Sequence, residues 1–442
     1  MENNTELGRL LSEAIQAEIE EPGSLSEMEK VIREQLLAVG RQALVHWLTQ
    51  MEGEKPEKTL SCAHCGAEAQ YERRREGQLR TMFGRIHYRR AYYSCAGCRR
   101  GHYPLDQALG LRANAMSAEL ERLAGMTGVQ LPFGQGSDLF AELTLVGLSD
   151  QSLDKAAQAY GTEVEEVERE WQAAARDEET LLQRKREERP PLRLYGAVDA
   201  TKVHLRGEEE DPWRDLKVGA WFEARGRPPK QPDGDWQIEA EQVTYYTDIC
   251  ASSAFSKLLW SSGVQRHAQL ARELVFLGDG AEWIWNIVAE NFPDAIQILD
   301  WFHACEYLMP VAKAAFDDEA QQEAWVQETK TALWEGRLDE AIAACWALAD
   351  ERREKDPAAT AATYFQKNRK RMDYPAFRAQ GYHIGSGTIE SAAKQIGTQR
   401  MKVPGARWNE QSARRVAKAR AAFLSGQWPS LARRRARLPL VA

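Results

Sequence analysis

Three carboxylates in this 442-residue sequence stand where they could bind divalent metal ions. Asp199 ends one hydrophobic segment, Asp279 comes just after a second, and Glu390 begins a late helical segment. A hydrophobic strand that ends in Asp places the carboxylate at a sheet edge, and the glycines at 278 and 280 let the backbone approach a ligand closely. Three such carboxylates can hold two Mg²⁺ or Mn²⁺ ions about 4 Å apart. Each Asp alone is more often a turn residue or a helix cap.

Four of the seven cysteines form two Cys-x-x-Cys pairs with 29 residues between them: Cys62, Cys65, Cys95 and Cys98. Each pair can supply two thiolates to one tetrahedral ion, so the pattern predicts one structural Zn²⁺. Segments 78–83 and 85–93 have the alternation of strands around Gly84, and such a hairpin would bring the pairs together. Four unconnected free thiols are the alternative.

The net charge of −8 hides two basic blocks, because residues 71–100 carry +7, residues 391–442 carry +11 and the remainder carries −26. Basic blocks interleaved with aromatic residues suit a phosphate backbone. The predicted DNA contacts are Arg73, Arg74, Arg75, Arg80, Arg85, Arg89, Arg90, Lys394, Arg400, Lys402, Arg407 and Trp408. The alternatives are a solvated face for the first block and a surface helix for the second, with Trp408 in the core instead of stacked on a base. The arginines of 433–437 are expected to form a tail that orders on DNA.

Hydrophobic spacing predicts the elements that must position these residues. Residues 24–51 have the pattern of an amphipathic helix for helix packing or oligomer contact. Residues 115–175 suggest a helix-turn-helix with its turn at 159–162, although the acidic second helix favours a scaffold over a DNA reader. After the double proline at 190–191, three strands, a helix, a strand, a helix and a strand predict an α/β core with a mixed sheet. A helical block then fills 301–380, and one long basic helix is expected from about residue 388.

These patterns predict six regions along the chain. They are an N-terminal helical region at 1–55, a zinc-ribbon-like DNA-binding module at 56–110, a helical region and linker at 111–190, the first part of the α/β core at 191–300, an all-helical insertion at 301–383, and the last core helix with a basic tail at 384–442.

The composition excludes several classes of protein. Hydrophobic residues make up 43% and charged residues 28%, which is a globular balance rather than that of a disordered or collagen-like chain. No apolar run reaches the roughly 20 residues that span a bilayer, and the first residues are acidic where a signal peptide is basic. Seven cysteines are too few for a disulfide scaffold, so we expect a cytoplasmic protein.

The order of the three carboxylates resembles that of the DDE transposases, which have a ribonuclease-H-like core. The chain is most similar to the IS-Kra group of bacterial insertion-sequence transposases, relatives of the Mutator-like elements. The resemblance covers most of the chain and depends on a set of motifs. They are the paired Cys-x-x-Cys module, Gly278-Asp-Gly-Ala-Glu-Trp-Ile-Trp285, Leu299-Asp-Trp-Phe-His303, Gly385-Ser-Gly-Thr-Ile-Glu-Ser391, Arg400-Met-Lys402 and Arg407-Trp408.

The resemblance implies that Asp199, Asp279 and Glu390 form the catalytic triad, with the all-helical insertion between the second and third carboxylates. Asp300 and His303 match the Asp-x-x-His signature of the Mutator-like relatives, where they would orient DNA or support the triad. The alternative is an Asp that caps the next helix, with His303 packed on the first turn.

The activity implied is metal-dependent cleavage at transposon terminal inverted repeats and strand transfer into target DNA. The expected partners are double-stranded DNA, at transposon ends and target, and a second copy of the chain or more. Neither a membrane partner nor a small-molecule cofactor is expected, and within the cytoplasm the protein would associate with the nucleoid. Two alternatives remain: a ribonuclease-H-fold nuclease or resolvase without strand transfer, and a domesticated DNA-binding regulator.

Overall fold

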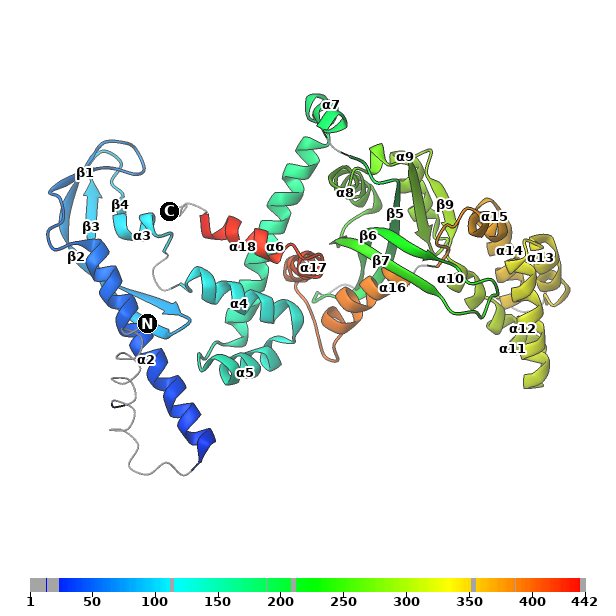
Figure 1. Cartoon of the computed structure of the whole chain (residues 1–442), viewed down its shortest axis with the longest axis horizontal. Coiled ribbons are helices and arrows are strands. Elements are labelled where there is room, and N and C mark those ends of the chain that lie inside the picture. Colours follow the sequence, from blue (N-terminus) through cyan, green and yellow to red (C-terminus); the bar gives the residue numbers. More distant parts are fainter. Residues whose placement is uncertain are drawn as a thin grey trace. The chain divides into compact units, whose positions relative to one another are not determined.

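The computed structural model describes residues 13, 24–111, 115–187, 189–207, 212–350, 355–385 and 387–437. Helices and two separate β-sheets make up the chain (Figure 1), so it is a mixed α/β protein. It divides into two compact units, Met1–Ala157 with Pro429–Ala442 and Gln158–Trp428. Among the described residues no helix is both long and apolar enough to cross a membrane.

The first unit contains a four-stranded antiparallel sheet in the order β1-β2-β3-β4. Its strands are β1 (Thr59–Ser61), β2 (Glu68–Thr81), β3 (Gly84–Cys95) and β4 (Gly101–His102). Helix α2 (Leu25–Glu52) contacts β3, which β4 pairs only at its end. The Glu52 carboxylate accepts a 2.6 Å hydrogen bond from the Ala91 amide, so the helix satisfies part of an otherwise open strand edge.

Helices complete the first unit. Helices α4 (Ala118–Gln130), α5 (Phe133–Thr144) and the start of α6 (Asp150–Ala174) share a hydrophobic cluster that includes Leu120, Phe140 and Leu153. The unit also contains α3 (Pro104–Ala108) and most of α18 (Trp428–Arg437). The prediction that the arginines of 433–437 form a tail that orders only on DNA is wrong, because these residues lie in α18. Within α18, Arg435 forms a 2.8 Å ion pair with Glu121, while 438–442 lie outside the described residues.

The predicted helix-turn-helix is also wrong, because α6 is one continuous helix from Asp150 to Ala174. Gly161, taken as a turn signal, lies against α17 (Glu410–Leu424). A Cβ at this position would be 2.2 Å from the carbonyl oxygen of Arg415. The glycine therefore permits close packing of two helices rather than a turn.

The second unit contains a mixed five-stranded sheet in the order β7-β6-β5-β8-β9. Its strands are β5 (Arg193–His204), β6 (Trp213–Arg227), β7 (Gln237–Asp248), β8 (Glu273–Gly278) and β9 (Ile296–Leu299). The first three form an antiparallel meander, and β8 and β9 run parallel to β5. All five strands lie where the sequence predicted strands, in the same order. In the stretch predicted as a charged linker, α7 (Glu178–Glu187) precedes them.

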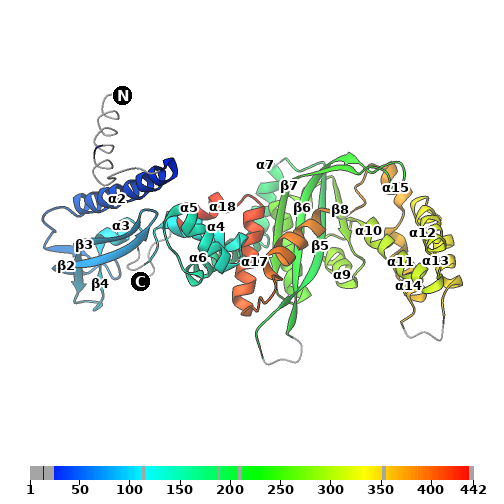
Figure 2. The same cartoon turned by 90° about the horizontal axis from the view of Figure 1, so that it is seen from below.

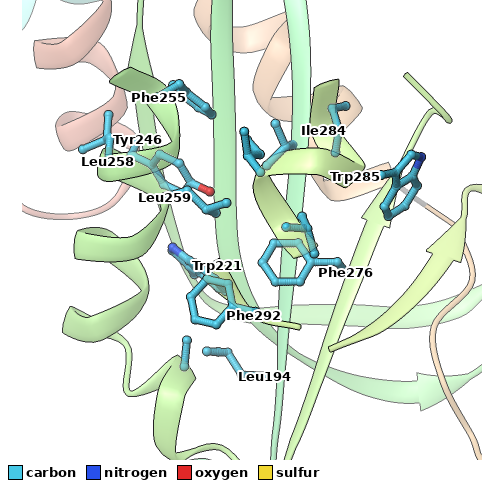
Figure 3. Close-up of a cluster of buried hydrophobic side chains, with 14 residues drawn as sticks. Leu194, Trp221, Tyr246, Phe255, Leu258, Leu259, Phe276, Ile284, Trp285 and Phe292 are labelled. Carbon is cyan, nitrogen blue, oxygen red and sulfur yellow. The ribbon is translucent and has the colours of Figure 1, made fainter. Parts of the chain in front are cut away.

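Helices pack on both faces of this sheet. Helices α8 (Ser252–Gln265) and α9 (Glu282–Asn291) contribute to the aromatic cluster in Figure 3, which also contains Val198 of β5. Side chains alternate along a strand, so Thr201 lies on the opposite face, where it contacts Gly397. That face carries α16 (Gly387–Ala392) and the π-helix η3 (Ala393–Met401), seen against the strands in Figure 2.

The single long basic helix expected from about residue 388 is wrong. The π-helix ends at Met401, and a loop that contains Pro404 and Gly405 precedes α17. Proline cannot continue the hydrogen-bonding pattern, and Gly405 has a φ of +79°. The C-terminal segment therefore turns and packs α17 against β7.

A helical block separates β9 from α16 in the sequence. It consists of α10 (Trp301–Glu306), α11 (Leu308–Ala315), α12 (Glu319–Trp334), α13 (Leu338–Ala347), α14 (Pro357–Asn368), η2 (Arg369–Arg371) and α15 (Tyr374–Ala379). The chain returns to the sheet after α15, where the Trp301 amide donates a 2.9 Å hydrogen bond to the Ile384 carbonyl. This bond anchors the segment leading to Glu390 beside the end of β9.

Candidate functional site

The four cysteines predicted to bind zinc form one cluster. Sulfur atoms of Cys62 and Cys98 are 3.7 Å apart, those of Cys65 and Cys95 are 3.6 Å apart, and all four lie within 4.8 Å of one another. A tetrahedral zinc with Zn–S bonds of about 2.3 Å requires S–S separations of roughly 3.8 Å. The donor set and its size therefore fit a zinc ion.

The two Cys-x-x-Cys segments adopt matching turns. The Gly66 amide donates to the Cys62 carbonyl at 2.9 Å, and the Arg99 amide donates to the Cys95 carbonyl at 2.8 Å. Both donors have positive φ, +75° for Gly66 and +58° for Arg99. The His64 amide donates to the Cys62 sulfur at 3.4 Å, and this bond lowers the pKa of the Cys62 thiol to about 7. A thiolate is the form that binds metal.

The arginines of this module divide into exposed and structural groups. Arg73, Arg85 and Arg89 are exposed. Three others are partly buried by packing: Arg74 donates to the Glu54 carbonyl at 3.0 Å, the Arg75 guanidinium lies 3.5 Å from the Tyr92 ring centroid, and Arg80 donates to the Ser152 hydroxyl at 3.1 Å.

The prediction that Arg90 contacts DNA is wrong. It is 2% exposed and forms a 2.6 Å ion pair with Asp106, which also accepts a 2.8 Å hydrogen bond from Tyr88. Because the pair is buried and fully engaged, Arg90 holds α3 against β3 and cannot reach a phosphate.

The carboxylates predicted to bind metal come from three parts of the second unit. Asp199 lies on β5 and Asp279 directly follows β8, the strand that pairs with β5. Asp199 is two residues before Thr201, so its side chain lies on the sheet face that contacts η3. Glu390 lies on α16, one turn before η3, and α16 contacts both β5 and β6.

A tyrosine pair from the helical block supports the backbone at Asp279. The Tyr364 hydroxyl donates a 2.5 Å hydrogen bond to the Asp279 carbonyl, and its ring stacks on Tyr307 with centroids 4.0 Å apart. Gly280 has a φ of +88°, and a Cβ there would be 2.7 Å from the Tyr364 ring. Sequence reasoning missed both tyrosines, because nothing local links them to Asp279, 85 residues before Tyr364.

Asp300, His303 and Glu390 also meet. One donor atom from each lies within 4.8 Å of the others, and Nε2 of His303 is 3.9 Å from Oε1 of Glu390. Asp300 is fully buried and accepts a 2.7 Å hydrogen bond from the His303 amide as the N-cap of α10. The capping interpretation of Asp300 is therefore confirmed, and the same arrangement brings His303 to Glu390.

The electrostatics of this region favour a cation. Burial raises the pKa of Asp199 to about 6, and the nearby carboxylates of Asp279 and Glu390 act in the same direction. Burial alone would lower the pKa of His303, but the carboxylates of Asp300 and others nearby raise it above its usual value. Oxygen ligands concentrated in a partly buried site are the donor set of Mg²⁺ or Mn²⁺. The donor types thus suit a hard divalent ion. Among the described residues, however, Asp199 and Asp279 are not in the group whose donor atoms lie within 4.8 Å of one another, which consists of Asp300, His303 and Glu390.

The basic residues after Glu390 separate in the same way as those of the zinc module. Lys394, Lys402 and Arg407 are exposed. Arg400 is 1% exposed, and Trp408 is buried and donates a 2.9 Å hydrogen bond from its indole to the Met401 carbonyl. The predicted contacts of Arg400 and Trp408 with DNA are therefore corrected: both residues pack η3 against the protein.

A scan of protein-family models and a search of curated proteins returned no match to this chain.

Proposed function

We propose that this chain is a DDE transposase similar to the IS-Kra group, which cuts transposon-end DNA and joins it to a target. The observation that carries the proposal is that Asp199 and Asp279 follow the paired ends of β5 and β8, and that Glu390 lies on α16, which contacts β5. The carboxylates of Asp279 and Glu390 are near enough to act on the pKa of Asp199. The sheet supports a ribonuclease-H-like fold, because three antiparallel strands followed by two parallel ones give the order 3-2-1-4-5.

Asp199, Asp279 and Glu390 would hold one or two Mg²⁺ or Mn²⁺ ions. Bound ions of this kind lower the pKa of an attacking water or 3′-hydroxyl and neutralise charge on the leaving oxygen. The protein's own contribution is positional. The Ala200 and Ala281 amides donate to the carboxylates of Asp199 and Asp279, at 2.6 and 2.9 Å, and fix their orientation.

The proposed reaction has two displacements at phosphorus. In the first, a water oxygen attacks the phosphorus at the transposon end, the bond to the 3′-oxygen breaks, and that oxygen leaves as a hydroxyl. In the second, this 3′-hydroxyl attacks a target phosphorus and displaces a target 3′-oxygen. Neither step needs a covalent bond between protein and DNA. His303, beside Glu390, orients that carboxylate.

Exposed basic residues provide the proposed DNA contacts in each unit. Arg73, Arg85 and Arg89 lie on the zinc-binding module, and Lys394 and Lys402 follow Glu390. Neutralising phosphates in this way gives binding that weakens with salt. Two transposon ends must be cut and joined together, so a dimer or larger assembly on DNA is proposed.

Cleavage of labelled transposon-end DNA in Mg²⁺ tests the proposal. Asp199→Asn and Asp279→Asn should each abolish cleavage, because the amide has lost the charge that holds a cation, whereas Asp294→Asn, an exposed residue in a turn, should cleave normally. Cleavage by either active-site variant would refute the proposal. Products that join a labelled 3′ end to target DNA distinguish a transposase from a nuclease or resolvase, and a wild-type protein that binds but never nicks would be a regulator.

A further inference from the structure

A large cavity adjoins the carboxylate site inside the second unit. It has a volume of about 1280 Å³ and is lined by residues from α9, the α13–α14 region and the turn before α11. Gly280, the residue after Asp279, lines one end. Tyr364 also lines the cavity while its hydroxyl holds the Asp279 carbonyl. A ligand here would therefore lie beside Asp279.

The cavity wall contains a buried donor with no acceptor. Trp285 is 4% exposed, and its indole Nε1 has no hydrogen-bond partner among the described residues. Figure 3 shows this nitrogen on the side of the ring turned away from the aromatic cluster. Leaving a buried N–H unpaired is unfavourable, and an acceptor atom of a ligand in the cavity would satisfy it.

Flat aromatic faces form another part of the lining. Trp346 is 44% exposed although it is large and apolar, and Tyr307 presents the second ring of the Tyr307–Tyr364 stack. Nucleobases stack on aromatic side chains without regard to sequence. The lining thus offers stacking faces together with a hydrogen-bond donor.

The charges of the lining suit a ligand with a few phosphates rather than a dense polyanion. Lys355 and Lys367 are exposed, and Arg371 lies 4.5 Å from the Trp285 ring centroid. Three acidic residues, Glu282, Asp350 and Asp356, also line the cavity. The Asp356 carboxylate is engaged as the cap of α14, where it accepts a 2.9 Å hydrogen bond from the Ala359 amide.

We propose that this cavity binds unpaired nucleotides of the DNA strand whose phosphate lies at the carboxylates. The inference rests on the proposed function, since it takes DNA as the ligand of the site. Successive nucleotides rise about 3.4 Å along a strand, so nucleotides next to a phosphate at Asp279 reach Gly280 and the cavity within one or two steps. Small-molecule sites occupy about 300–1,000 Å³, and this larger cavity accommodates more than one nucleotide.

Binding of a fluorescein-labelled six-residue oligothymidine to the full chain tests this inference, measured by anisotropy without added divalent metal. Trp346→Ala should weaken binding about tenfold through the loss of one stacked base, and Lys367→Ala should weaken binding and reduce its salt dependence. Two matched controls should bind as wild type: Trp213→Ala, whose side chain is 43% exposed on β6, and Lys313→Ala, on α11. Trp285→Phe keeps one aromatic ring but removes the pyrrole ring with its N–H, and it should also weaken binding.

The result that overturns the inference is an oligonucleotide affinity unchanged by Trp346→Ala and Lys367→Ala, or wild-type protein that binds duplex DNA but not the oligonucleotide. Since the assay contains no metal for catalysis, it does not depend on cleavage. Cleavage by Asp199→Asn would refute the proposed function and leave oligonucleotide binding as measured. If wild-type protein cleaves transposon-end DNA but the cavity variants leave oligonucleotide binding unchanged, only the inference about the cavity would be refuted.

Discussion

Gly397 controls how closely η3, which directly follows α16 and its Glu390, approaches the sheet. A Cβ at this position would lie 2.5 Å from Cγ2 of Thr201, about 1 Å inside ordinary carbon–carbon contact. Gly397→Ala must therefore push η3 away from β5. Overpacking of this kind costs about 1–3 kcal/mol, whereas alanine in a helix gains at most about 1 kcal/mol over glycine. The clash prevails, and we expect a net loss of about 1 kcal/mol.

Two measurements follow from that displacement. The melting temperature should fall by roughly 2–4 °C, and a shift of Glu390 by about 1 Å should lower the rate of end cleavage about 100-fold. Thr201→Ser removes the methyl group that clashes, since the other two Thr201 atoms near Gly397 are 3.5 and 3.6 Å from the added Cβ. The double variant should recover both properties beyond the sum of the single changes. A Gly397→Ala protein that melts at or above the wild-type temperature would refute the close approach of η3 to β5.

Three further predictions concern charge, metal and backbone. Because burial raises the pKa of Asp199 to about 6, the free energy of unfolding without divalent metal should fall as pH rises from about 4 through 6. Asp199→Asn lacks the buried charge, so its stabilisation relative to wild type should grow by about 1–2 kcal/mol between pH 5 and 7.5 in urea titrations. A difference independent of pH would contradict this. Atomic absorption should find one zinc per chain in the wild type and in Cys345→Ser, at a buried cysteine outside the cluster, whereas Cys65→Ser should lose it. Arg99→Gly should stabilise the zinc-loaded protein by about 1 kcal/mol because of its positive φ, and a loss of stability would count against the matching turns.

The elements around the carboxylates were predictable because their signals are local. Runs of apolar residues marked β5 and β8, but the prediction that Asp199 ends its strand is wrong, because β5 continues to His204. Parallel pairing of these two strands ends at Ala197 and Leu277, two residues before Asp199 and Asp279 respectively. Zinc ligation was predictable for the same reason, since each Cys-x-x-Cys turn is set by a few neighbouring residues.

The failed predictions involve contacts between segments distant in the sequence. Gly161 has the same local signal whether it begins a turn or packs against Arg415, and only the position of α17 distinguishes the two. Trp408 similarly has the composition of a stacking residue, but its indole is bonded to the Met401 carbonyl in the core. The role of Tyr364 depends on a hydrogen bond across 85 residues. From a single sequence, the type of a glycine or an aromatic residue does not reveal which distant residue it contacts.

The charge pattern of the sequence likewise does not show which basic residues are paired inside the protein, and the basic C-terminal block is an example. Its helix α17 packs on the acidic helix α6, where Arg415 pairs with Glu165 at 3.2 Å and Lys418 with Glu168 at 2.6 Å. Lys418 is 2% exposed, so its charge compensates buried carboxylates and contributes nothing to a DNA-binding surface. The acidic residues of α6, which argued against a DNA-reading helix, thus hold α17 in place through these ion pairs. Positive charge remains exposed at residues such as Lys394, one turn beyond Glu390, where the proposed reaction requires it.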